Sequence, residues 1–235
     1  MRITIYLISA SYLSRSRFRQ IADGLVAASD GPARALRLEE DGQSLWHALD
    51  AARDEGAKEI LLRPTGIPFS QSLAAWLPGA AADWLARQGD EAPLVLWTDP
   101  VDLDPAIHAV LANAPCEPRP IAASRGAANG RGWDTLGPVG RHVLVCTGPR
   151  CHMRDGTDLA REISRQTSLA GLRDVEVIRT SCLVPCNRGP VVILYPQGQW
   201  FRLTSRADVA RFVEKALVQR VACPDLETFI TGEPA

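Results

Sequence analysis

Short apolar runs alternate along the first half of the chain with longer segments in which apolar residues recur at every third or fourth position. A short apolar run predicts a strand, and the longer spacing predicts a helix. The predicted strands cover residues 3–8, 33–38, 58–63 and 93–98, and the predicted helices cover residues 18–28, 44–55, 73–87 and 105–112. Strands that alternate with helices predict an α/β unit with a parallel sheet and helices on both faces.

The pattern after residue 141 predicts a second unit with a different element order. The elements are a strand at residues 142–146, a helix between Asp155 and Gly171, a strand at residues 175–179, a hairpin of residues 191–195 and 200–203, and a helix that starts at Ser205. The first helix is expected to bury Leu159, Ile163, Gln166 and Leu169, and the last helix Val209, Phe212, Val213, Ala216 and Leu217. The second unit therefore combines a short sheet with two amphipathic helices.

The segment between the two units, residues 114–140, is rich in Pro, Ala, Gly and Arg and has almost no apolar periodicity. This composition is typical of a linker. The sequence therefore predicts an N-terminal domain over residues 1–113, a linker over residues 114–140 and a C-terminal domain over residues 141–235. The N-terminal domain is long enough to bury a core of its own.

Charge and hydropathy argue against two classes of protein. The net charge is −1, with 13 Lys and Arg against 17 Asp and Glu in residues 1–140, and 13 against 10 in residues 141–235. Because no basic stripe is interleaved with aromatic residues, we expect no nucleic-acid binding. No run of eighteen apolar residues predicts a membrane span, and no signal peptide follows Arg2, so we expect a soluble cytoplasmic protein.

Four of the six cysteines form two close pairs that are far apart in the sequence. Cys146 and Cys151 are five residues apart, and Cys182 and Cys186 are four apart. Two thiolate pairs that converge from distant segments predict a four-sulfur metal site, and structural zinc and iron-sulfur clusters both take four Cys ligands. In a reducing cytoplasm, paired cysteines indicate a metal more often than a disulfide.

The spacing of the cysteines narrows the choice of metal. Plant-type ferredoxins place three ligands in one C-x4-C-x2-C loop, and a haem attachment requires Cys-x-x-Cys-His, so both are excluded. Structural zinc sites usually have two to four residues between neighbouring ligands. The spacing of the second pair lies within this range, and the spacing of the first pair lies at its upper limit. Zinc therefore stays open, and with it a structural or interaction protein.

Residues 142 to about 228 resemble the thioredoxin-like 2Fe-2S ferredoxins, which include the corresponding small subunit of NADH dehydrogenases. The resemblance rests on Val-Cys-Thr-Gly-Pro-Arg-Cys, Thr-Ser-Cys-Leu-Val-Pro-Cys-Asn-Arg-Gly-Pro and Leu-Tyr-Pro-Gln-Gly-Gln-Trp-Phe. It implies a thioredoxin-like fold in which Cys146, Cys151, Cys182 and Cys186 ligate one 2Fe-2S cluster, two cysteines to each iron.

The resemblance also implies a one-electron carrier with a redox partner. Because the sequence shows no nucleophile, general base or nucleotide site, we expect a carrier rather than a stand-alone enzyme. Arg150, Arg154 and Arg188 lie beside the cysteines, where their charge would favour a partner with an acidic docking surface. Related ferredoxins often form dimers, so a homodimer stays open.

The N-terminal domain resembles the small cobalt and sirohydrochlorin chelatases of the cobalamin and sirohaem pathways, in element order and in residues 7–25, 48–76 and 98–111. Those chelatases hold their metal with two histidines, and the corresponding stretches here are residues 9–11, Ser-Ala-Ser, and residues 70–72, Ser-Gln-Ser. Insertion of a metal into a tetrapyrrole requires basic imidazoles, which serine and glutamine do not replace. We therefore expect a docking or ligand-binding domain. The alternative is a tetrapyrrole metal-insertion protein to which the iron-sulfur cluster supplies electrons.

Two tryptophans and two cysteines remain outside these patterns. Trp76 and Trp84 are eight residues apart on a predicted helix, where they would either fill the core or line a tetrapyrrole-sized cleft. Cys116 and Cys223 have no second cysteine close in sequence, so we expect neither to ligate a metal.

Overall fold

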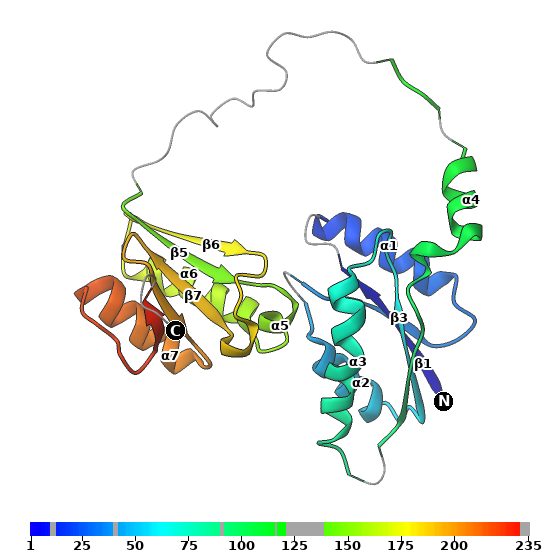
Figure 1. Ribbon diagram of the computed structural model, residues 1–235, viewed down its shortest axis with the longest axis horizontal. Coiled ribbons are helices and arrows are strands. Elements are labelled where there is room, and N and C mark those ends of the chain that lie inside the picture. The colour runs from blue at the N-terminus through cyan, green and yellow to red at the C-terminus, as the bar shows by residue number, and fades with distance from the viewer. Residues whose placement is uncertain (10–12, 40–41, 90–91, 116, 121–138, 231–235) are drawn as a thin grey trace.

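The computed structural model describes residues 1–9, 13–39, 42–89, 92–115, 117–120 and 139–230 (Figure 1). Its N-terminal unit contains a four-stranded sheet with the order β2-β1-β3-β4, in which every neighbouring pair is parallel. The strands are β1 (Arg2–Ile8), β2 (Ala33–Arg37), β3 (Glu59–Pro64) and β4 (Leu94–Trp97), and the helices are α1 (Arg15–Ala27), α2 (Leu45–Asp54), α3 (Gln71–Leu85), η1 (Val101–Leu103) and α4 (Pro105–Asn113). The predicted parallel α/β unit is confirmed.

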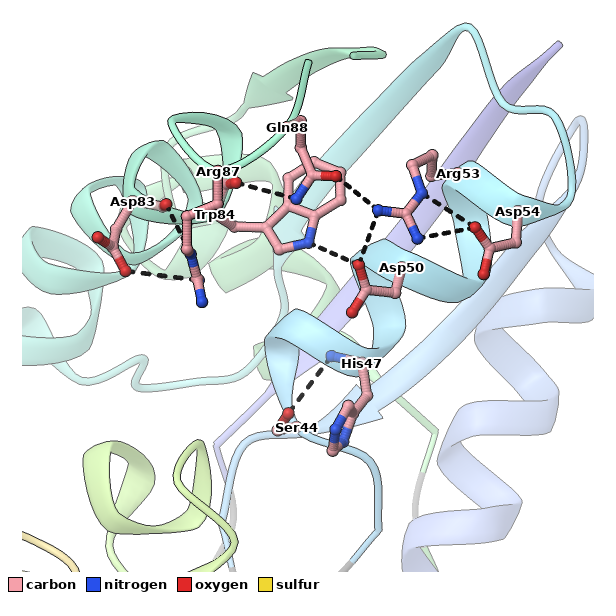
Figure 2. A network of polar contacts seen from close by, with 9 residues as sticks. All are labelled: Ser44, His47, Asp50, Arg53, Asp54, Asp83, Trp84, Arg87 and Gln88. Carbon is pink, nitrogen blue, oxygen red and sulfur yellow. Dashed lines mark hydrogen bonds and ion pairs between the residues drawn. The ribbon is translucent and has the colours of Figure 1, made fainter. Parts of the chain in front are cut away.

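Helices α2 and α3 supply most of the helical side chains in the core of this unit. Trp84 of α3 is 2% exposed, and its indole Nε1 donates a hydrogen bond to Asp50 of α2 at 3.0 Å. Figure 2 shows this contact and the neighbouring Arg53, which pairs with Asp50 and donates a hydrogen bond to the Gln88 side chain. Trp84 is therefore a core residue that ties α3 to α2.

Replacing Trp84 with alanine should lower the free energy of unfolding of the N-terminal unit by about 3–5 kcal/mol, because a fully buried indole is removed and a cavity remains. Trp84→Phe keeps most of the buried ring and leaves Asp50 without its indole donor, so its cost should be nearer 1–2 kcal/mol. Urea unfolding followed by far-ultraviolet circular dichroism measures both. Equal costs for the two variants would contradict this account of the packing.

The C-terminal unit contains a five-stranded sheet with the order β6-β5-β7-β8-β9. Its elements are β5 (Arg141–Cys146), α5 (Pro149–His152), α6 (Gly156–Leu169), β6 (Val175–Thr180), η2 (Cys186–Arg188), β7 (Val191–Tyr195), β8 (Gln199–Arg202), α7 (Arg206–Phe212), η3 (Val213–Gln219) and β9 (Glu227–Ile230). Strands β5 and β6 are parallel, and the remaining pairs are antiparallel. The predicted hairpin is therefore confirmed, and so is the buried face of the last helix, Val209, Phe212, Val213, Ala216 and Leu217.

Three details of this unit differ from the sequence-based prediction. Leu169 is 74% exposed and Thr167 is buried instead, because Leu169 lies six residues beyond Ile163, about 240° further round the helix. The last helix continues from α7 into the π-helix η3, and β9 adds an edge strand that is too short to give a clear pattern.

Within the described ranges, no helix has the length and apolar character needed to cross a bilayer.

Candidate metal centre

The first cysteine pair lies where β5 leaves the sheet. Cys146 ends β5 and Cys151 lies in α5, and both are 2% exposed and pack against Val191 and Ile193. The Cys151 thiol donates a hydrogen bond to the sulfur of Cys146. This bond lowers the pKa of Cys146 to about 6 and, together with burial, raises the pKa of Cys151. The hydrogen bond therefore favours the thiolate form of Cys146 over that of Cys151.

The second pair lies on the loop that follows β6. The sulfur atoms of Cys182 and Cys186 are 3.4 Å apart, and desolvation raises the pKa of the Cys182 thiol although the residue as a whole is exposed. Strands β5 and β6 are parallel neighbours, and their last residues, Cys146 and Thr180, are register partners. Both cysteine loops therefore leave the sheet at the same edge.

Glycines at two positions allow the two loops to approach each other closely, and a third allows the first loop to fold tightly on itself. A Cβ atom at Gly189 would lie 2.6 Å from the sulfur of Cys151, and one at Gly148 would lie 3.0 Å from the backbone of Cys182. A Cβ atom at Gly156 would lie 2.7 Å from the carbonyl oxygen of Cys151. For Gly148 and Gly189 the sequence carries a signal that was not used, a Gly-Pro dipeptide close to each cysteine pair, and for Gly156 it carries none.

Arg154 bridges the two loops from the side of the first pair. Its Nη1 donates hydrogen bonds to the carbonyl oxygens of Cys186, at 2.8 Å, and of Gly189, at 3.5 Å. The three arginines expected to favour an acidic partner therefore differ in exposure. Arg154 is half-buried in these contacts, and Arg150 is half-buried with its guanidinium 5.1 Å from the Trp76 ring centroid, whereas Arg188 is exposed.

The donor set suits an iron-sulfur cluster or zinc, because both take four thiolates. As the side chains lie, the described residues contain no group of three or more Cys, His, Asp or Glu side chains placed to hold a metal ion. The space kept by Gly148 and Gly189 and the hydrogen bonds of Arg154 fit a bound group, cluster or zinc, between the loops. Burial of Cys146 and exposure of Cys182 would leave one edge of that group near the surface.

The N-terminal unit contributes a cleft beside the second cysteine pair. Ser70, Ser72 and Trp76 line it from α3 and the residue before it, and Cys182 and Cys186 line it from the other unit. Its volume of about 210 Å³ lies below the ~300–1,000 Å³ of sites for drug-sized ligands. Trp84 is a core residue and does not line this cleft, so the two tryptophans do not share a tetrapyrrole-sized cleft.

The stretches that correspond to the chelatase histidines supply hydroxyl groups instead of imidazoles. Ser9 donates a hydrogen bond to Glu39 at 3.0 Å, and the hydroxyls of Ser70 and Ser72 are 3.0 Å apart. Ser11, the remaining hydroxyl of these stretches, lies outside the described residues.

Three relatives match the chain over about a third of its length. A Priestia megaterium protein described as a 2Fe-2S ferredoxin is 29% identical over 85 residues, which cover 36% of this chain and 66% of that protein. A 2Fe-2S ferredoxin of Clostridium pasteurianum is 28% identical over 82 residues, covering 31% and 80%. A 2Fe-2S ferredoxin of Aquifex aeolicus is 30% identical over 87 residues, covering 33% and 78%. No family model matches the chain.

Solved structures of two kinds are similar to parts of the chain. The thioredoxin-like [2Fe-2S] ferredoxin from Aquifex aeolicus is 26% identical and covers 40% of this chain and 94% of that one, with a TM-score of 0.37. A cobalamin (vitamin B12) biosynthesis CbiX protein from Marinobacter aquaeolei VT8 is 17% identical and covers 48% and 92%, with a TM-score of 0.40.

Proposed function

Because the chain belongs to the 2Fe-2S ferredoxin family, we propose that residues 141–235 carry single electrons on a 2Fe-2S cluster ligated by Cys146, Cys151, Cys182 and Cys186. The observation that carries this proposal is the convergence of the two thiol pairs at one edge of the C-terminal sheet. When bound, such a cluster takes up and releases one electron at a time. An electron carrier of this kind needs no nucleophile or general base.

Backbone amides of both loops point at the cysteine sulfurs. The N–H groups of Leu183 and Gly148 donate hydrogen bonds to Cys146, and the N–H of Val191 donates to Cys151. Hydrogen bonds to ligand sulfur stabilise the added negative charge of the reduced state and raise the reduction potential. Burial of the first pair keeps water from that side of the site, and exposed Cys182 marks the side at which electrons would enter and leave.

Analysis of iron and acid-labile sulfide in anaerobically purified protein tests this function. We expect two irons and two sulfides per chain, since four thiolates are the full ligand set of one 2Fe-2S cluster. Stoichiometric zinc without iron would overturn the proposal and favour the structural or interaction role instead. Visible absorbance gives an immediate first answer, because zinc thiolates are colourless.

The Arg154→Gln variant should release iron to a chelator about tenfold faster than the unaltered chain. The guanidinium makes charge-assisted hydrogen bonds to the carbonyls of Cys186 and Gly189, and bonds to charged groups are worth about 1.5–3 kcal/mol. The reduction potential should also fall, because a positive charge near the cluster is lost. Arg165→Gln, which removes the same charge from the exposed face of α6, is the control. Equal rates in the two variants would refute a positioning role for Arg154.

We propose that the redox partner has an acidic docking surface, since exposed Arg188 lies two residues after Cys186. Arg188→Glu should lower the second-order rate of cluster reduction by about tenfold at low salt, because rim charges act mainly on association. The difference should shrink as salt shortens the Debye length, which is about 8 Å at physiological ionic strength. Stopped-flow reduction by the cognate partner measures it, and a salt-independent rate would exclude electrostatic docking at Arg188.

We propose the domain division that the sequence predicts: an N-terminal domain over residues 1–113, a linker over residues 114–140 and a C-terminal domain over residues 141–235. We also propose that the N-terminal domain binds a ligand. The cleft beside Cys182 supports ligand binding, and the hydroxyl side chains of Ser9, Ser70 and Ser72 argue against metal insertion. We also propose a cytoplasmic location, because the cysteines that would ligate the cluster have to stay reduced. A homodimer stays a prediction.

A further inference from the structure

The cleft beside the second cysteine pair is part of a packed contact between the two units. Met153 is 8% exposed and belongs to the hydrophobic core of the N-terminal unit, although it follows the α5 helix of the other unit. The Nε2 of buried His152 lies 3.3 Å from the carbonyl oxygen of Gln43, and its Nδ1 lies 2.9 Å from the hydroxyl of Thr157. Figure 1 shows α5 on the side of its unit that faces α2 and α3. The cleft walls are therefore held together by apolar and polar contacts.

The lining of the cleft combines an aromatic face, a cation and hydroxyl groups. Trp76 is half-buried, and the Arg150 guanidinium lies over its ring. Within the part of the chain that the structure describes, Arg150 makes no hydrogen bond or ion pair, so its donors are available to a ligand. The hydroxyls of Ser70 and Ser72 add donors and acceptors along one wall. Glu39 also lines the cleft and accepts a hydrogen bond from Ser9.

From this lining we propose that the cleft binds a planar aromatic anion of one or two rings, with its ring against the edge of Trp76 and its anionic group at Arg150. The Arg150 guanidinium covers one indole face, so a flat ring packs at the indole edge, and a carboxylate or sulfonate suits the fork of guanidinium donors. The volume of about 210 Å³ limits the ligand to one or two rings. Because Cys182 and Cys186 also line the cleft, such a ligand would lie against the exposed edge of the cluster. That last step rests on the proposed function, whereas the binding itself does not.

Calorimetric titration of the cluster-loaded full chain with 2-naphthoate tests this proposal. We expect saturable binding of 2-naphthoate, at least tenfold weaker binding of neutral 2-naphthamide, and at least tenfold weaker binding of non-planar cyclohexanecarboxylate. The circular dichroism of the cluster in the visible range should change on saturation with 2-naphthoate. Equal binding of all three compounds would overturn the assigned ligand class, and no binding of 2-naphthoate would overturn the site.

Two variants locate the ligand. Arg150→Gln and Trp76→Leu should each weaken 2-naphthoate binding by about tenfold or more, since each removes one of the two main contacts. Arg87→Gln is the matched control, because Arg87 stacks on Trp46 at 3.8 Å in the N-terminal unit and does not line this cleft. If Trp76→Leu fails to fold, Trp76→Phe replaces it and should bind more weakly than the unaltered chain. Unchanged binding in Arg150→Gln would place the ligand elsewhere.

Iron and sulfide content, measured on the same samples, separates the two proposals. If the protein holds zinc and still binds 2-naphthoate at Arg150, the electron-carrier proposal is refuted and the proposed ligand site in the cleft is supported. A chain with two irons that binds no 2-naphthoate would keep the carrier and refute the cleft site.

Discussion

Replacing either buried cysteine of the first pair, as in Cys146→Ser or Cys151→Ser, should remove the cluster, with iron content at least about tenfold below that of the unaltered chain. Both sulfurs are almost fully enclosed by apolar side chains, so no water or buffer thiol can reach the position of a missing ligand. Four thiolates are also the full ligand set of the cluster. Iron and sulfide analysis after anaerobic purification gives the content of each variant.

Replacing either cysteine of the second pair with serine should lower the iron content to a different degree. Cys182 is exposed, so its hydroxyl replacement or a solvent molecule can complete the coordination, and Cys182→Ser should retain a cluster with an altered absorption spectrum. Cys186 is half-buried beside the Arg154 contact, and Cys186→Ser should retain less. The order of iron content should therefore follow the exposure of the replaced residue. A reversed order would show that the cluster lies on the other side of the loops.

Cys223→Ser is the control for these variants. Cys223 is fully buried in the hydrophobic core of the C-terminal unit, and it lies outside the cluster of side chains around Cys146 and Cys151. The substitution should lower stability without removing iron from the folded protein. Cys116 lies outside the described residues, and Cys116→Ser should likewise keep the iron. Iron loss in either control would contradict the assignment of four ligands.

Local patterns in the sequence were sufficient to predict the strand ends that carry the cysteines. The apolar run before Cys146 is short and uniform, as buried strands are, and the segment before Cys182 is a short strand with Val175, Val177 and Ile178 interrupted by Glu176. Parallel neighbours bring their carboxyl ends to one edge, so the meeting of the two pairs follows from the element order. The resemblance then supplied the identity of the metal, which spacing alone left open.

These local patterns do not predict contacts between segments that are distant in the sequence. The sequence places Arg154 near the cysteines but does not indicate that its guanidinium turns inward to the carbonyl of Cys186. Met153 gave no signal that it packs into the core of the other unit, because a single apolar residue after a cysteine has no periodicity. The linker composition of residues 114–140 favoured two independent domains, and only the structure reveals the contact between them.

Alanine in place of Gly189 should empty the metal site while leaving the fold in place. The new Cβ atom would lie 2.6 Å from the sulfur of Cys151, a separation that real Cβ atoms essentially never show. The sulfur is the end of a short side chain, so rotation of Cys151 relieves this clash, and the Cys186 carbonyl oxygen, 3.2 Å from the new Cβ atom, needs to move only by a few tenths of an ångström. That rotation, however, moves the thiol away from the position between the two loops. We therefore expect iron content at least about tenfold below that of the unaltered chain, with circular dichroism in the far ultraviolet unchanged.

Two further glycine variants distinguish loss of the site from loss of the fold. A Cβ atom at Gly156 would lie 2.7 Å from the carbonyl oxygen of Cys151 and 3.0 Å from that of Cys146, so Gly156→Ala forces the backbone itself to move. It should lower the unfolding midpoint as well as the iron content. Gly24→Ala in the exposed helix α1 meets no atom within 4 Å and should keep full iron, with stability equal or higher by up to about 1 kcal/mol. Full iron in Gly189→Ala would mean that Cys151 is not a ligand in its present orientation, since its sulfur cannot keep that place beside a Cβ atom.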